Sequence, residues 1–444
     1  MGWIFLFVTV LGAVFTCNVF RPTYASPGRA AASFFAGWLT GELALHHIAW
    51  QFLSTLAFVW AGALDTWPGK LGLLIALVSW SGLAYAWWEG RAAEPTMEAA
   101  LRRAFGEDYA SRILPEVATR LSVGIRWRPI VRPFPIRDPG VERIRGIVYH
   151  RAAGLSLKLD VYRHRSRPTA CPTLLQIHGG GWVIGTKDQQ GLPLMTHLAA
   201  EGWVCVSVNY RLSPHATFPD HLIDIKHALR WIREHGAEYG ADPGFVVVTG
   251  GSAGGHLAAL VALTANDPEY QPGFEQVDTS VAACVPFYGV YDFIDRMGFH
   301  RHSGLANLLE RQVMKASVHE AREAYEKASP VSRVHEAAPP FLIVHGDRDS
   351  LVPVAEARHF ASELGRVATA RVAYAEIPGA QHAFEIFPSL RTALVIQGVE
   401  RFLALIYSEY ERDRRAVPQP TLAGAQSNPG TANNHHGGTA CVSA

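Results

Sequence analysis

The sequence has little net charge and few cysteines. Across 444 residues, 40 Lys and Arg balance 39 Asp and Glu, which leaves a formal net charge of +1. Such a balance gives no electrostatic attraction to nucleic acid or to an acidic partner. The cysteines are scattered and show neither the spacing of a metal site nor a disulfide framework, which favours a reducing compartment. They are Cys17, Cys171, Cys205, Cys284 and Cys441.

Charged residues are scarce overall, at 18%, whereas hydrophobic residues make up 49%. Apolar residues gather near the amino terminus in three runs that contain no Asp, Glu, Lys or Arg, at 2–20, 43–64 and 71–88. The first run would be roughly 28 Å long as a helix, close to the thickness of the hydrocarbon core of a bilayer. We therefore expect residues 1–90 to form a transmembrane region of about three helices.

Two other interpretations of these runs are open. They could be buried helices of a soluble domain, although so many apolar runs with little polar periodicity disfavour this. The first run could be a cleaved secretory signal, but no Lys or Arg precedes it and two further apolar runs follow.

The charges around the three runs predict an orientation. Arg21 and Arg29 lie between the first two runs, and three arginines follow the third run, at 91, 102 and 103. With three spans these two regions share one side, and the excess of positive charge marks that side as cytoplasmic. We therefore expect a multi-pass protein of the inner or plasma membrane, with its amino terminus outside and its larger carboxy-terminal part in the cytoplasm.

The rest of the chain divides into three parts. Residues 91–143 are expected to be an extended connector that could belong to a cap, because prolines cluster near their end. Residues 144–410 alternate short β-rich runs with helical stretches, which predicts an α/β domain with a mostly parallel sheet and helices on both faces. Within it, 289–330 interrupts the alternation and could form a lid. Residues 411–444, rich in Pro, Gly, Asn and Ser, are expected to be a disordered tail. The expected strands are 147–150, 156–162, 173–178, 203–210, 245–250, 281–288, 341–346 and 371–377, and the expected helices are 217–236, 253–265, 354–365 and 389–409.

A serine between glycines follows one of the buried strands. Residues 250–254 read GGSAG, which fits the pattern G-x-S-x-G, and they lie between an apolar strand and a helical stretch. A sharp strand-to-helix turn of this kind exposes a nucleophilic serine, here Ser252, at the end of a sheet. A plain glycine-rich turn or a phosphate cradle is the alternative, although the lysine of a phosphate-binding Walker loop is missing.

A second glycine motif supports acyl transfer. HGGGW, residues 178–182, directly follows the strand TLLQI. Acyl transfer develops negative charge on the carbonyl oxygen, and backbone N–H groups aimed at that charge stabilise it. We expect the N–H groups of Gly180, Gly181 and Ala253 to form this oxyanion hole.

A serine nucleophile needs a base, and the base needs an orienting carboxylate. Strand FLIVHG is followed by Asp347 and Asp349, and strand RVAYAEI is followed by His382. Both groups emerge after a strand and could meet Ser252 at one edge of the sheet. We expect a triad of Ser252, His382 and Asp349, with Asp347 as the alternative carboxylate.

These motifs resemble the hormone-sensitive-lipase-like branch of the α/β-hydrolases and related carboxylesterases. The resemblance covers about residues 144–408 and also includes NYRLSP (209–214), HGDRDSLVP (345–353) and GAQHAF (379–384). It implies an α/β-hydrolase fold and ester hydrolysis through an acyl-enzyme, and its D-x-L position corresponds to Asp349. Gly251 and His215 depart from the branch, which usually has Asp and Glu there, so the resemblance does not fix the subfamily or the substrate.

The sequence thus predicts a membrane-anchored serine carboxylesterase or lipase. Its partners would be a small-molecule or lipid ester and the membrane; no metal or organic cofactor is implied, and the oligomeric state is open. Two alternatives are a different serine acyl hydrolase, such as an acetyl xylan or feruloyl esterase or a peptidase, and a non-catalytic binding module with the same fold.

Overall fold

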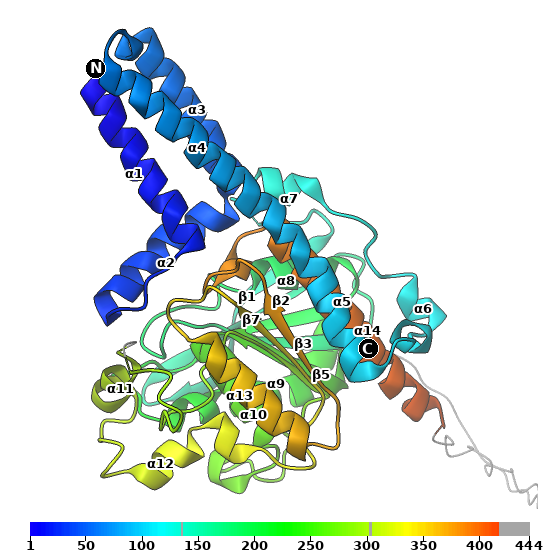
Figure 1. Ribbon diagram of the computed structural model, residues 1–444. Coiled ribbons are helices and arrows are strands. Elements are labelled where there is room, and N and C mark those ends of the chain that lie inside the picture. The colour runs from blue at the N-terminus through cyan, green and yellow to red at the C-terminus, as the bar shows by residue number, and fades with distance from the viewer. Residues whose placement is uncertain (135, 302–303, 417–444) are drawn as a thin grey trace, which may run out of the picture.

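A computed structural model describes residues 1–134, 136–301 and 304–416. It consists of a sheet-centred domain and a group of apolar helices that projects from it (Figure 1). The predicted tail begins at 411, but helix α14 (Leu390–Ala416) continues through its first residues, and 417–444 lie outside the described residues.

The centre of the molecule is an eight-stranded sheet in the order β1-β2-β4-β3-β5-β6-β7-β8. Its neighbours from β4 to β8 pair in parallel, and β2 pairs antiparallel with both β1 and β4. The prediction of a mostly parallel sheet is therefore confirmed, and each expected strand overlaps an observed one. The strands are β1 Val141–Ala152, β2 Leu155–His164, β3 Cys171–Ile177, β4 Val204–Val208, β5 Ala241–Gly251, β6 Ala283–Phe287, β7 Phe341–Gly346 and β8 Val372–Ile377.

Helices cover both faces of the sheet, which explains why its central strands are continuous apolar runs. In β5, Val246 and Val248 belong to one hydrophobic cluster, whereas Phe245 and Val247 belong to the cluster on the opposite face. The first cluster includes residues of α9 (Asp220–His235), α10 (Ala253–Leu263) and α13 (Val354–Val367). The second includes residues of α5 (Ala93–Phe105), α8 (Leu192–Ala200) and α14.

The connector is less extended than the sequence suggested. It contains α5, whose buried Met97 and Leu101 pack into the sheet domain, and two short helices, α6 (Pro115–Ala118) and α7 (Trp127–Val131). Pro129 stands in the first turn of α7, where its missing N–H removes no helical hydrogen bond. The proline cluster therefore does not prevent α7, and Pro133 lies just beyond the end of this helix.

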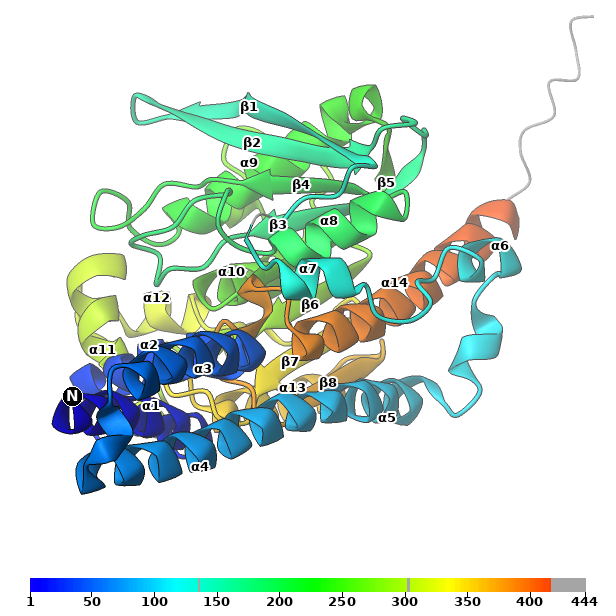
Figure 2. The same ribbon diagram turned by 90° about the horizontal axis from the view of Figure 1, so that it is seen from above.

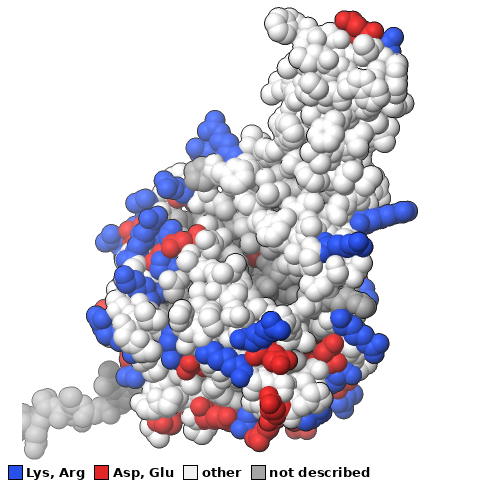
Figure 3. Space-filling view, turned by 90° about the vertical axis from the view of Figure 1, so that its left-hand side faces the viewer, with Lys and Arg blue, Asp and Glu red and all other residues white. Residues whose placement is uncertain are grey.

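Three of the amino-terminal helices lie side by side and project from the sheet domain (Figures 1 and 2). They are α1 (Gly2–Phe20), α3 (Ala44–Trp60) and α4 (Trp67–Glu89). Among the described residues, two helices are long and apolar enough to cross a membrane, Gly2–Phe20 and the continuous Trp67–Phe105, or three if the bent pair of α2 and α3 counts as one span. On the face in Figure 3 the projection carries charge only at its tip, consistent with Asp65 and Lys70 in the turn before α4 and in its first turn.

The segment between the first two apolar runs, to which the sequence analysis assigned no helix or strand, contains helix α2 (Pro27–Glu42). Ser26 caps this helix by accepting a hydrogen bond from the Arg29 N–H, and Pro27 occupies its first position, where proline is favoured. Helix α2 meets α3 at an angle of 88°. It therefore lies across the base of the projection instead of continuing it.

Two ion pairs tie the base of the projection to the sheet domain. Glu89 at the end of α4 binds both terminal nitrogens of Arg348, at 2.7 and 2.8 Å. Glu42 at the end of α2 pairs with Arg391, and both side chains are almost fully buried. The projection and the domain are thus joined by specific contacts next to the edge of the sheet where β7 ends.

Candidate active site

Ser252 stands at a sharp turn between β5 and α10. Its backbone angles, φ 58° and ψ −123°, lie in a sparsely populated region that costs about 1–3 kcal/mol and persists only where the surroundings impose it. The Ser252 N–H donates to the Phe287 carbonyl oxygen at 3.0 Å, which fixes the turn against β6. A Cβ on Gly254 would lie only 2.2 Å from the Ile177 carbonyl oxygen, so the following turn of helix requires glycine there.

The HGGGW loop packs directly against this turn. A Cβ on Gly179 would lie 3.1 Å from the Ser252 Cβ and 2.5 Å from the Gly251 carbonyl oxygen. Gly180 (φ +114°) and Gly181 (φ +59°) then bend the loop so that both line one cavity with Ser252. Ala253 is the first residue of α10, where backbone N–H groups have no partner within the helix. Of the three expected oxyanion donors, Gly180 and Gly181 thus share a cavity with Ser252, and Ala253 follows Ser252 directly in the chain.

His382 and Asp349 form a hydrogen-bonded pair. His382 Nδ1 lies 2.6 Å from Asp349 Oδ2, and Asp349 Oδ1 accepts from the N–H groups of Leu351 and Val352, each at 2.8 Å. Although burial favours the neutral acid, the adjoining rings of His382 and His345 hold the pKa of Asp349 well below its usual range. An ionised carboxylate only accepts, so Nδ1 of His382 carries a proton and donates it to Asp349. His382 lines the same cavity as Ser252.

The alternative carboxylate, Asp347, has other partners. It accepts from the Gly379 N–H at 2.7 Å, and burial raises its pKa. The geometry therefore brings Asp349, and not Asp347, to His382.

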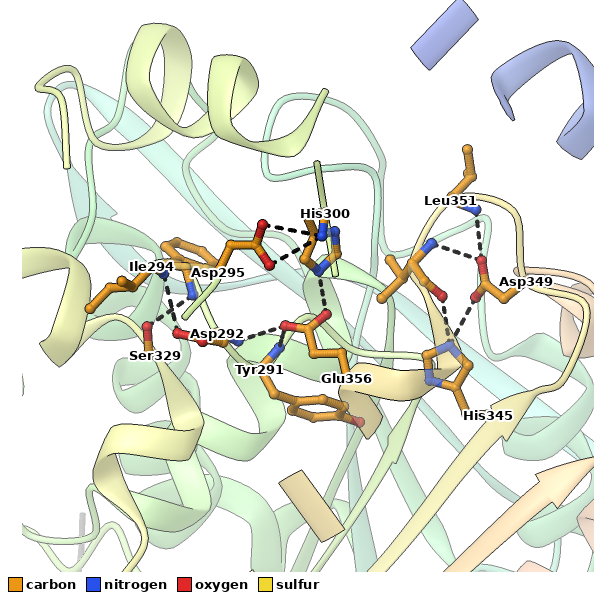
Figure 4. A network of polar contacts seen from close by, with 12 residues as sticks. Tyr291, Asp292, Ile294, Asp295, His300, Ser329, His345, Asp349, Leu351 and Glu356 are labelled. Atoms are coloured by element: carbon orange, nitrogen blue, oxygen red, sulfur yellow. Dashed lines mark hydrogen bonds and ion pairs between the residues drawn. The ribbon is translucent and has the colours of Figure 1, made fainter. Parts of the chain in front are cut away.

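The sequence analysis assigned no role to His345, the fifth residue of β7. Its Nε2 lies 2.9 Å from the Val352 carbonyl oxygen and 3.2 Å from Asp349 Oδ2 (Figure 4). Its position four residues before Asp349, at the end of a strand, is the one signal that could have indicated this contact. His345 thus helps to hold the carboxylate that holds His382.

His178 supports the glycine loop from behind. Its ring stacks on Tyr210, with centroids 4.4 Å apart, and the Tyr210 hydroxyl donates to the His178 carbonyl oxygen at 3.0 Å. Burial lowers the pKa of His178 to about 4, so the ring is neutral near pH 7. Its Nδ1 donates to the Gly179 carbonyl oxygen at 2.8 Å, which orients the loop.

Tyr288 flanks the catalytic histidine candidate. Its ring centroid lies 4.5 Å from that of His382, and its hydroxyl donates to Glu385. Burial raises the pKa of Glu385 to about 7. The tyrosine therefore covers His382 with an apolar face while its polar end is satisfied elsewhere.

The cavity in front of Ser252 has a volume of about 480 Å³. Leu305 and Leu308, from α11 (Leu305–Leu308) in the predicted lid segment, form part of its lining. Helix α2 forms another part of the wall, which the sequence analysis missed, through Ala31, Phe34, Phe35 and Trp38. The ring of Phe34 meets that of His382 edge-on at 5.9 Å. The cavity is thus mostly apolar, and residues from the base of the projection form part of its wall.

A second histidine–carboxylate pair also borders the cavity. His300 Nε2 lies 2.5 Å from Glu356 Oε2, and Glu356 Oε1 accepts from the N–H groups of Tyr291 and Asp292 (Figure 4). Although burial disfavours the charged ring, Glu356 raises the pKa of His300. Within the described ranges, no group of three or more His, Cys, Asp or Glu side chains could hold a metal ion.

Comparisons with known proteins agree with this arrangement. The sequence profile of the BD-FAE family matches residues 159–364. The chain is 41% identical over 428 residues to "Probable carboxylic ester hydrolase LipM" of Mycobacterium tuberculosis, covering 94% of this chain and 96% of that protein. It is 36% identical to "Esterase LipQ" of the same organism, covering 85% of each.

Among solved structures, a bifunctional GH43-CE protein of Bacteroides eggerthii superposes with a TM-score of 0.52 and 26% identity. The match covers 60% of this chain and 35% of that one. The glycine loop, the strained serine and the mostly parallel sheet agree with these similarities. The chain therefore belongs to the family of carboxylic ester hydrolases that includes LipM and LipQ, and it is an enzyme of ester hydrolysis.

Proposed function

We propose that the protein is a membrane-anchored serine carboxylesterase that acts through an acyl-enzyme. The observation that supports this most strongly is the pairing of His382 with Asp349 at 2.6 Å, on the wall of the cavity that Ser252 also lines. A hydroxyl, an imidazole and a buried carboxylate in one site are the components of a serine hydrolase triad.

In this mechanism Ser252 attacks the ester carbonyl carbon. His382 Nε2 takes the serine proton as the new C–O bond forms, and Asp349 stabilises the resulting imidazolium. The tetrahedral intermediate then collapses, His382 returns the proton to the leaving alcohol, and the acyl group stays on Ser252. Water, deprotonated by His382, attacks the acyl-enzyme. The second tetrahedral intermediate collapses as His382 returns the proton to the Ser252 oxygen, and the acid is released.

The negative charge on the carbonyl oxygen would be held by the N–H groups of Gly180, Gly181 and Ala253. Each such donor typically lowers the barrier by about 3–4 kcal/mol, because it is already oriented and needs no reorganisation. The positive end of α10 adds to this stabilisation, since Ser252 precedes its first residue.

The membrane anchor consists of α1, α3 and α4, with the base of the projection at the membrane surface. Their exposed side chains are apolar along most of the length, including Phe7, Leu53 and Val78. Tryptophans at the ends, such as Trp3 and Trp67, fit the preference of indole rings for the membrane–water interface. The arginines near the base favour a cytoplasmic catalytic domain.

The experiment that tests the catalytic proposal uses the full-length protein in detergent. Ser252→Ala should abolish hydrolysis of p-nitrophenyl esters and labelling by a fluorophosphonate probe, while circular dichroism stays unchanged. Undiminished turnover by the variant would refute Ser252 as the nucleophile. Absence of labelling in the unmodified protein would instead favour a non-catalytic binding module.

A further inference from the structure

Helix α2 is the starting point, because it belongs both to the apolar projection and to the active-site wall. It meets α3 at 88°, so if α3 crosses a bilayer, α2 lies in the plane of the membrane surface. Between Arg29 and Glu42 the helix carries no charged side chain. An uncharged helix in this plane has its apolar side chains at the level of the lipid.

The catalytic domain holds α2 in place through polar contacts at several points. The Trp38 indole N–H donates to the Ala383 carbonyl oxygen at 2.8 Å, next to His382. The Ser350 hydroxyl donates to the Ala30 carbonyl oxygen at 3.2 Å, next to Asp349. The wall that α2 contributes is therefore fixed with respect to the proposed triad.

Five aromatic rings extend from the cavity to the surface, and we call them the aromatic ledge: Phe34, Phe35, Trp38, Phe134 and Phe387. Phe34 contacts both Phe35 and Trp38, with centroids 4.9 and 5.2 Å apart. Phe387 contacts Trp38 at 5.1 Å and Phe134 at 5.3 Å.

The ledge is exposed at its two ends, Phe35 and Phe134, and buried between them where Phe34 meets His382. Phe34 is 8% exposed beside His382, whereas Phe35 and Phe134 are 65% and 64% exposed. A continuous apolar surface thus connects the proposed catalytic histidine to the outside of the molecule. Large aromatic side chains exposed together are costly in water, and they mark a surface that meets apolar molecules.

The surroundings of the Phe134 end of the ledge match a membrane surface. His46, in the first turn of α3, donates to the Val131 carbonyl oxygen at 3.1 Å, so α7 lies against the base of the projection. Helix α7 exposes Trp127 and Val131 together with Arg128, the combination of apolar, indole and cationic groups that anchors proteins at lipid headgroups. Figure 3 shows Lys and Arg side chains on both sides of the base of the projection, below its uncharged middle part.

We infer that the substrate is a neutral ester whose apolar chain resides in the bilayer, and that it reaches Ser252 laterally along the aromatic ledge. This inference rests on the proposed esterase function. The chain of the ester would move from lipid onto aromatic side chains and into the apolar cavity without being exposed to water, while the carbonyl arrives between the glycine loop and His382. A water-soluble short ester would not need this path.

The test compares two substrates with one leaving group in the full-length protein reconstituted into phosphatidylcholine vesicles. One is 4-methylumbelliferyl oleate embedded in the vesicles, and the other is soluble 4-methylumbelliferyl acetate. Phe35→Glu places a charge on the exposed part of the ledge, where the apolar chain of the ester would pass. It should lower the ratio of oleate to acetate turnover by ~10-fold or more, which corresponds to about 1.4 kcal/mol or more. The neutral Phe35→Gln should lower the ratio less, and it also serves if the charged variant fails to fold.

The matched control is Leu155→Glu. Leu155 is 52% exposed at the β1–β2 turn, on the opposite edge of the sheet from the projecting helices (Figure 2). This variant should leave the turnover ratio unchanged. The lateral path would be overturned if both Phe35 variants kept the wild-type ratio, or if they lost equal activity toward both substrates. In either case, acetate hydrolysis that depends on Ser252 would still support the esterase proposal. No hydrolysis of either ester by the unmodified protein would instead refute the proposed function itself.

Discussion

The imidazole of His345 lies 3.2 Å from the Asp349 oxygen that also contacts His382. One carboxylate oxygen therefore faces two rings, and the other oxygen accepts from two backbone N–H groups. With four donors around it and complete burial, Asp349 is held in one position and in its ionised form. This arrangement distinguishes Asp349 from Asp347, although both follow the same strand.

The first prediction concerns this pair of aspartates. Asp349→Asn should reduce kcat by ~10⁴-fold, because an amide favours the wrong tautomer of the catalytic histidine. Asp347→Asn keeps an oxygen that can accept from the Gly379 N–H. It should change kcat by less than about threefold, because substitutions away from the reacting groups usually have small energetic effects. Steady-state hydrolysis of a short p-nitrophenyl ester measures both, and the reverse order of effects would reassign the carboxylate.

The second prediction concerns the glycine loop. A Cβ on Gly180 would lie 2.1 Å from the Ile184 carbonyl oxygen, so Gly180→Ala must displace the loop. Loss of an oxyanion donor lowers kcat by ~10²–10³-fold in comparable enzymes, with little change in KM. In Gly181→Ala the nearest atom would be a Leu308 carbon at 3.4 Å, so this matched variant should lose less. Equal activity of the Gly180 variant and the unmodified protein would exclude this loop from the oxyanion hole.

The third prediction addresses the contact between α2 and the catalytic domain. Glu42→Ala leaves the buried guanidinium of Arg391 without its carboxylate, which typically destabilises by about 3–5 kcal/mol. We expect faster tryptic cleavage after Arg29 and a lower melting temperature in detergent. The double variant with Arg391→Met removes both charges and should recover most of the stability. Additive effects of the two substitutions would show that the pair is not coupled.

The fourth prediction is a pH dependence of stability. Burial raises the pKa of Glu385 from 4.5 to about 7, so between these values the folded protein binds a proton that the unfolded chain has released. Stability should therefore decrease as the pH rises from 4.5 to 7, and the full cost of the buried charge remains above pH 7. Glu385→Gln should remove this contribution and raise the melting temperature at pH 8 by about 2–4 °C, with little effect at pH 4.5. Melting curves in detergent at both pH values measure it, and a higher melting temperature at pH 4.5 alone would contradict the assignment.

The fifth prediction concerns orientation. A reporter that is active only outside the cytoplasm should give low signal when fused after residue 140 and high signal when fused after Asp65, at the tip of the projection. High signal from the fusion after residue 140 would reverse the proposed topology.

Much of the sheet domain could be predicted from the sequence, because its strands are short apolar runs bounded by glycine and its helices have regular spacing. Ser252 and His382 could be named because Ser252 directly follows a strand of the parallel sheet and His382 lies in the loop five residues after another. The choice between Asp347 and Asp349 needed either the resemblance or the structure, since both lie within three residues of the end of β7.

Helix α2 could not be assigned a role from the sequence alone. Ser26 and Pro27 form a readable helix start, but the apolar residues that follow are diluted by alanine and glycine between two stronger apolar runs. That Phe34 and Trp38 line the active-site cavity depends on docking against Ala383 and His382, which are more than 340 residues away in the chain. Contacts at such separation leave no local pattern. The role of His345 was missed for a related reason, because the turn after β7 determines which side chain meets Asp349.

The position of α2 has a consequence for how this enzyme can be dissected. To obtain a soluble fragment of such a protein, the apolar amino-terminal helices are usually deleted first. Here that deletion would remove Phe34, Phe35 and Trp38 from the wall of the cavity. The remaining fragment would keep Ser252, His382 and Asp349, but the cavity in front of Ser252 would lose its α2 wall and be more open to water. Its substrate profile would describe a different catalyst, so selectivity measured on the isolated hydrolase portion should not be transferred to the intact protein.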